Sequence, residues 1–149
     1  MAAKPARRPA APTRPAARRA PLVLLVDDVP DNRMVYSMWL DAAGFRTAEA
    51  STGEEALEFV GRMRPDIVVM DLSLPQMDGW EATRRIKQDP ASRGIPVVAL
   101  TGFALGEHAH RAREAGCDVV ITKPCLPEDL EKVLRDLLGR ASEEPRRRT

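Results

Sequence analysis

Three aspartates, a threonine and a lysine each directly follow a short apolar run of the sequence. They are Asp27 and Asp28 after Leu22–Val26, Asp71 after Ile67–Met70, Thr101 after Val97–Leu100 and Lys123 after Val119–Thr122. Three carboxylates in one crevice would repel each other, and a hard divalent cation with oxygen ligands, such as Mg²⁺, would relieve that repulsion. One carboxylate could then attack a phosphoryl group, while a metal ion and an ammonium group stabilise the transferring oxygens. These residue types therefore predict Mg²⁺-dependent phosphoryl chemistry, provided that the fold brings them together.

The apolar runs alternate with segments of helical periodicity. A fifth, weaker run covers Arg46–Glu49. The predicted helices are Asp31–Ala43, a segment that begins after Ser51 or Thr52 as N-cap and ends before Pro65, Gly79–Gln88, Glu107–Ala115 and Glu128–Leu138. Five such units predict an α/β fold, a doubly wound five-stranded parallel sheet with helices on both faces, of flavodoxin-like type. Ligands of such sheets bind outside the carboxyl ends of the strands, where the five polar residues would lie.

Helix ends and faces can also be predicted from the sequence. One stripe at helical spacing in the first helix consists of Val35, Met38, Trp39 and Ala42. Gly44 follows as a stop signal, and Gly139 is expected to end the last helix in the same way.

Charge divides the 149-residue chain into three parts. Residues 1–20 carry six basic side chains and no acidic one, and residues 140–149 carry four arginines and two glutamates. Removing these from the 23 basic and 22 acidic residues of the chain leaves 13 and 20 for residues 21–139. We therefore expect a basic, disordered Ala/Pro/Arg tail (1–20), one acidic domain (21–139) and a polar C-terminal tail (140–149).

Targeting signals and metal-binding cysteines are not expected. The apolar run Leu22–Val26 is too short for a secretory core, and no stretch approaches membrane-spanning length, which favours a soluble, cytoplasmic protein. Cys117 and Cys125 lack zinc-ligand spacing and are expected to be buried or half-buried thiols.

Four stretches of the sequence resemble a known family. The segments LLVDD, VVMDLSLPQMDGWEATRRIK, IPVVALTGF and AGCDVVITKP look like the receiver domains of two-component response regulators. The resemblance covers Pro21 to about Arg140, and no output domain is expected after it, as in a single-domain regulator.

The resemblance implies a role for each polar residue at the strand ends. Asp71 would be the phosphoacceptor, and Mg²⁺, with Mn²⁺ as a substitute ion, would be bound by Asp27, Asp28, Asp71 and the backbone carbonyl of Ser73. Thr101 would be the switch hydroxyl and Lys123 the cation that pairs with the phosphate. Pro124 would follow a cis peptide bond, and Pro75 and Gly79 would shape the turn after the acceptor.

One position departs from the family pattern, and two others would tune the lifetime of the phosphoryl group. Many receivers carry Tyr or Phe three residues before the lysine, whereas this chain has Val120, which is expected to be an ordinary core or half-exposed strand residue. Switching would then rely on movement of Thr101 and its loop. Ser73 and Phe103 border the path of attacking water in the family, although Phe103 could equally cap an apolar patch.

The expected partners are proteins. A histidine kinase or histidine phosphotransfer protein would supply the phosphoryl group, and an unknown target would read the phosphorylated surface. The basic tails are expected to be solubilising segments; alternatively they contact nucleic acid or fold back on the acidic domain. A second function class is a haloacid-dehalogenase-like phosphatase, but that class expects an aspartate where this chain has Ser73, and a cap domain.

Overall fold

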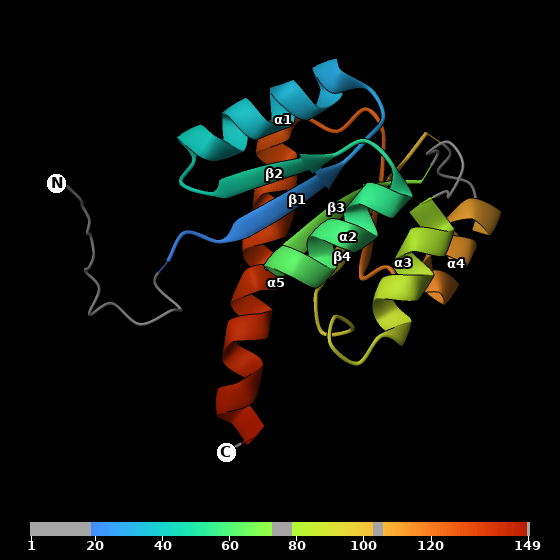
Figure 1. Ribbon diagram of the computed structural model, residues 1–149. Helices are drawn as coiled ribbons and strands as arrows, with labels where there is room; N and C mark the ends of the chain where they lie inside the picture. The colour runs from blue at the N-terminus through green and yellow to red at the C-terminus, as the bar shows by residue number, and fades with distance from the viewer. Residues whose placement is uncertain (1–18, 73–78, 103–105, 149) are drawn as a thin grey trace, which may run out of the picture.

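Five parallel strands form a single sheet in the order β2-β1-β3-β4-β5 (Figure 1). The computed structural model describes residues 19–72, 79–102 and 106–148. The strands are β1 (Leu22–Val26), β2 (Arg46–Ala50), β3 (Ile67–Asp71), β4 (Val97–Thr101) and β5 (Val119–Thr122). The strand order turns back between β1 and β3, and this is the switch point at which doubly wound sheets bind their ligands.

Helices cover both faces of the sheet. They are α1 (Pro30–Ala42), α2 (Gly53–Met63), α3 (Gly79–Gln88), α4 (Gly106–Ala115) and α5 (Pro127–Arg148). Helices α1 and α5 lie on one face, and α2, α3 and α4 lie on the other (Figure 1). The predicted fold class is confirmed.

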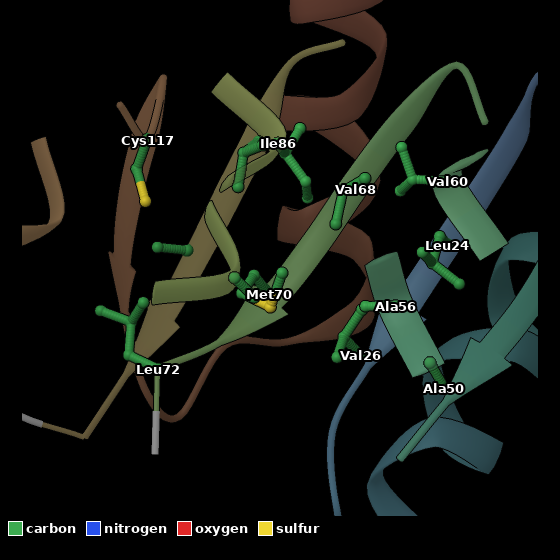
Figure 2. Close-up of a cluster of buried hydrophobic side chains, with 13 residues drawn as sticks. Leu24, Val26, Ala50, Ala56, Val60, Val68, Met70, Leu72, Ile86 and Cys117 are labelled. Atoms are coloured by element: carbon green, nitrogen blue, oxygen red, sulfur yellow. The ribbon is translucent and has the colours of Figure 1, made fainter. Parts of the chain in front are cut away.

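The core consists of two apolar layers, one on each face of the sheet. Alternate residues of β1 enter different layers: Leu24 and Val26 pack toward α2 and α3, and Val23 and Leu25 pack toward α1 and α5. Figure 2 shows the first layer, in which strand residues meet Ala56 of α2 and Ile86 of α3. Because both faces are covered, strands β1, β3 and β4 are buried throughout, and their residues are apolar except for Asp71 and Thr101 at the carboxyl ends of β3 and β4.

Local signals explain some of the helix ends. The side chain of Thr52 accepts a hydrogen bond from the backbone N–H of Glu55 at 3.1 Å, so Thr52 is the N-cap of α2. Gly44, after α1, has a φ of 102° in the left-handed region, where glycine is favoured. The predicted end of α5 at Gly139 is wrong, because the helix continues to Arg148. A glycine inside a helix costs only about 1 kcal/mol relative to alanine, and such a cost does not by itself end a helix.

Helix α1 buries a different face from the one that its apolar stripe suggests. Ser37 and Leu40 are buried, whereas Val35, Met38 and Trp39 are exposed, Met38 to 64%. The indole Nε1–H of Trp39 donates a hydrogen bond to Oε1 of Glu131 at 2.8 Å, and this exposed contact links α1 to α5. Helical periodicity identifies the stripe but does not predict which side of the helix faces the sheet, because apolar residues lie on more than one side of this helix.

Three further expectations concern the thiols, membrane spans and tails. Cys117 is buried and Cys125 half-buried, both are free thiols, and burial raises the pKa of Cys117 to about 11. Among the described residues, no helix is long and apolar enough to cross a membrane. Residues 1–18 of the expected tail lie outside the described residues; Ala20 is described, and its carbonyl accepts a hydrogen bond from Arg46.

Candidate functional site

Three carboxylates meet at the carboxyl ends of β1 and β3. These strands are neighbours in the sheet, so Asp27 and Asp28, which follow β1, lie beside Asp71, the last residue of β3. One oxygen from each carboxylate lies within 4.8 Å of the other two. Asp27 and Asp71 are only 6% and 4% exposed, whereas Asp28 is open to solvent. The cluster therefore has a buried wall and an open side.

Lys123 supplies positive charge to this cluster. Its Nζ lies 3.3 Å from Oδ2 of Asp71 and 4.0 Å from Oδ2 of Asp27. The backbone N–H of Lys123 donates to the carbonyl of Thr101 at 2.7 Å, which continues the pairing of β5 with β4. Thr101 itself is buried at the end of β4. The sheet thus brings together all five residues that the strand-end pattern predicted.

The turn between β1 and α1 is built around Asp27. Its Oδ1 accepts the backbone N–H of Val29 at 2.9 Å, and its Oδ2 accepts Nδ2 of Asn32 at 3.3 Å. The guanidinium of Arg33 donates to the carbonyl of Asp27 at 2.6 Å and forms an ion pair with Glu49 at 2.9 Å. Asn32 and Arg33 were not predicted as site residues. The only signal for this turn in the sequence is an aspartate just before a helix start, where its side chain can bond backbone two residues on.

Tyr36 connects α1 to the loop that follows Lys123. Its hydroxyl donates to the carbonyl of Cys125 at 2.7 Å. Burial, with smaller contributions from Cys125 and Asp27, raises the pKa of Tyr36 to about 12. The phenol therefore stays protonated at neutral pH and keeps its donor. The Lys123–Pro124 peptide bond in this loop is cis, as predicted.

Gly79 packs against the backbone at the end of β3. A Cβ atom at this position would overlap the carbonyl oxygen of Asp71 and would lie 2.7 Å from Cα of Leu72. Both contacts involve backbone, so no side chain could rotate away to make room. Glycine is required here by the close approach of α3 to the end of β3.

The donor set fits a hard divalent cation. Three carboxylates offer oxygen ligands within reach of one ion, and the exposed side at Asp28 leaves room for water or phosphate oxygens. The cluster contains no sulfur or imidazole group that would favour a softer metal. Because Lys123 balances only one of three negative charges, a bound cation would relieve the remaining repulsion.

Comparison with known proteins identifies the family to which this chain belongs. The model of the response regulator receiver domain matches residues 23–135, which include the whole constellation. The chain belongs to the response regulator receiver family. Receivers of this family act in two-component signalling, and this receiver has their five-stranded sheet.

This receiver matches several known proteins over nearly the full length of those proteins. The polar-differentiation response regulator DivK of Brucella anthropi is 34% identical over 119 residues, which are 80% of this chain and 97% of DivK. The receiver domain of sensor histidine kinase PA1611 from Pseudomonas aeruginosa, solved with magnesium in its active-site cleft, is 32% identical, with a TM-score of 0.75 over 80% of this chain and 98% of that one. A CheY-like receiver from Methanospirillum hungatei is 26% identical, with a TM-score of 0.79 over 84% and 98% of the two chains.

The remaining residues predicted for this receiver divide into two groups. Val120 is half-buried and packs against the core layer that contains Ile86, as expected for an ordinary strand residue. Ser73, Pro75 and Phe103 lie outside the described residues.

Proposed function

We propose that this receiver accepts a phosphoryl group on Asp71 from a histidine kinase or histidine phosphotransfer protein and passes the signal on through protein contacts. The observation that supports this most directly is the buried carboxylate of Asp71 with Nζ of Lys123 at 3.3 Å and two further carboxylates beside it. A nucleophile, a cation for the transferring oxygens and a set of metal ligands are thus in one place.

In the proposed reaction, a carboxylate oxygen of Asp71 bonds to phosphorus as the bond from phosphorus to the donor nitrogen breaks. The electron pair of that bond leaves with the donor imidazole. Lys123 stabilises negative charge on the transferred oxygens, and the hydroxyl of Thr101 donates a hydrogen bond to the new phosphoryl group. Mg²⁺, held by Asp27, Asp28, Asp71 and the carbonyl of Ser73, would supply additional charge neutralisation.

Incubation with acetyl phosphate tests this proposal. With Mg²⁺ present, intact mass is expected to rise by one phosphoryl group in the wild type and not in Asp71→Asn, because the amide is not a nucleophile. Chelation of Mg²⁺ is expected to prevent the increase. Rapid hydrolysis of unrelated phosphate esters, without a stable adduct, would instead support a phosphatase of the haloacid-dehalogenase-like class.

The surface beside the acidic cluster indicates how a protein donor would dock. Val29 follows Asp28 directly, Leu126 lies three residues after Lys123, and both are exposed. Met34, in the second turn of α1, is 51% exposed. Because a donor histidine must reach Asp71 from the open side, its protein would cover this apolar rim.

Met34→Glu is therefore expected to slow phosphotransfer from a histidine phosphotransfer protein about 10- to 30-fold, the loss of about 2 kcal/mol at an interface hot spot. The rate with acetyl phosphate should be unchanged, because that donor needs no protein interface. Met63→Glu is the matched control, since Met63 is 54% exposed at the end of α2, near the opposite edge of the sheet. Equal losses in both variants would contradict the docking surface.

A further inference from the structure

A groove crosses the edge of the sheet that lies opposite to the acidic cluster. It is formed by the segments that lead into β2, β1, β3 and β4, together with Leu138 of α5. Parallel strands begin at one edge and end at the other, so the strand length separates this groove from Asp71. The proposed phosphoryl chemistry makes no use of it.

Three arginines line this groove, one at the start of each of three neighbouring strands. Arg46 begins β2, Arg19 precedes β1 and Arg64 precedes β3. All three side chains are exposed. Neighbouring strands lie about 4.8 Å apart, so the backbone segments that lead into β2, β1 and β3 span about 10 Å across this edge of the sheet. Over about 10 Å of its axis, a nucleic-acid duplex carries about six negative charges.

The acidic residue among the described lining is already used by the fold. Asp66 accepts the backbone N–H of Leu22 through Oδ2 at 2.7 Å, which ties the start of β3 to β1. Arg46 donates Nε to the carbonyl of Ala20 at 2.9 Å, and this contact uses one of its five N–H donors. With three arginines and one aspartate among its described lining residues, the groove has a net positive charge although residues 21–139 as a whole are acidic.

Arg64 occupies a position where the backbone would favour glycine. It is the C-cap of α2 with a φ of 50°, in the left-handed region. That conformation destabilises a non-glycine residue by about 1–2 kcal/mol. The attraction of the Arg64 cation to the helix C-terminus stabilises the fold by only about 0.3–1 kcal/mol. Helix termination alone would thus be served better by glycine, so the side chain of Arg64 is not accounted for by stability.

Both ends of the sequence contain further basic residues. Residues 1–18 contain five basic side chains and no acidic one, and they lead directly into Arg19. Helix α5 passes Leu138 at the groove and extends beyond the sheet, and its last residues, 146–148, are arginines (Figure 1). The three arginines of the groove thus lie at one edge of the sheet, and the three clustered aspartates lie at the other.

We propose that this groove binds the phosphate backbone of double-stranded nucleic acid without base recognition. Guanidinium groups pair with phosphate oxygens through two parallel hydrogen bonds, and the described lining contains no aromatic ring on which a base could stack. An anionic membrane is a poorer fit, because residues 2–18 contain no large apolar side chain to insert. An acidic protein is also a poorer fit, because aromatic anchors usually dominate protein interfaces.

Fluorescence anisotropy of the full chain with a labelled DNA duplex of about 20 base pairs tests the proposal. Between about 50 and 200 mM NaCl, the affinity is expected to fall steeply and to be the same for unrelated sequences. Arg46→Gln combined with Arg64→Gln should weaken binding at least about fivefold at low salt. It should also reduce the slope of log K against log salt by about 1.8, the share of two phosphate contacts.

The control is Arg84→Gln combined with Lys132→Gln, which removes the same charge from exposed sites outside the groove. Thermal unfolding shows whether each variant is folded. Equal weakening by both double variants, or no weakening by the groove variant, would overturn the assignment of the groove. Tighter binding to polyglutamate or to anionic lipid vesicles than to the duplex would overturn the choice of nucleic acid. The measurement uses no phosphoryl donor, so its failure would leave the proposed function untouched.

Discussion

Replacing Asp28 with asparagine is expected to slow the phosphorylation of Asp71 by acetyl phosphate at least about 100-fold at saturating donor. Asp28 is the exposed member of the acidic cluster, whereas the carboxylate of Asp27 also holds the turn before α1 through Val29 and Asn32. The substitution at Asp28 therefore removes one proposed metal ligand and one charge without disturbing that turn. The rate is measured from intact mass at several times after the addition of acetyl phosphate and Mg²⁺.

The same substitution should change stability in opposite directions with and without the ion. Without Mg²⁺, Asp28→Asn is expected to raise the free energy of unfolding by about 0.5 kcal/mol, because it removes a like charge within 4.8 Å of two others. In the wild type, Mg²⁺ at a hundred times its dissociation constant should add about 2.7 kcal/mol, since the ion binds the folded state alone. In Asp28→Asn most of this gain should be lost.

Thermal unfolding in EDTA and in Mg²⁺ measures both effects. Asp41→Asn is the control: Asp41 is also exposed, but it lies at the end of α1 and accepts a hydrogen bond from Thr47 away from the cluster. It should leave the Mg²⁺-dependent gain and the phosphorylation rate as in the wild type. If Asp28→Asn kept the full Mg²⁺-dependent gain, the proposed metal ligands would be wrong.

The fold and the cluster could be predicted because both depend on simple patterns. Continuous apolar runs indicate strands buried on both faces, and the carboxyl ends of parallel strands share one edge, so the neighbours of Asp71 follow from the strand order. The contacts of Arg33 and Tyr36 could not be predicted in this way. In each contact, a long side chain from α1 reaches a backbone carbonyl: Arg33 reaches that of Asp27, and Tyr36 reaches that of Cys125. These distances depend on the folded structure and leave no periodic pattern in the sequence.

The wrong helix end at Gly139 and the solvent-facing stripe of α1 share a physical cause. Periodicity and glycine signals are local, whereas the face that a helix buries and the length to which it grows also depend on its neighbours. In α1, the sheet packs against Ser37 and Leu40, so the stripe that contains Met38 faces solvent. In α5, Gly139 permits a helical stop but does not adopt the positive φ that Gly44 and Gly116 have. These departures leave Val35, Met38 and Trp39 exposed on α1 and extend α5 beyond Gly139.

Gly79→Ala is expected to lower the free energy of unfolding by about 2–3 kcal/mol, in the range of overpacking substitutions in a close-packed core. The added methyl group would overlap the carbonyl of Asp71 and approach Cα of Leu72 to 2.7 Å. Only a shift of the backbone of β3 or of the start of α3 could relieve this contact. Such a shift would displace Asp71 from Lys123, so the variant should also lose phosphorylation at temperatures at which it is still folded.

Gly61→Ala is the matched control and should have the opposite sign. Gly61 lies in α2, and a Cβ there would meet nothing within 4 Å. Because alanine favours the helix and restricts the unfolded chain, this variant should gain about 0.4–1 kcal/mol and phosphorylate normally. Urea unfolding and the acetyl phosphate assay measure both quantities for both variants. If Gly79→Ala were as stable as the wild type, the close approach of α3 to the end of β3 would not constrain this position. A loss of stability with an unchanged phosphorylation rate would show that the backbone relaxes through α3 and leaves Asp71 in place.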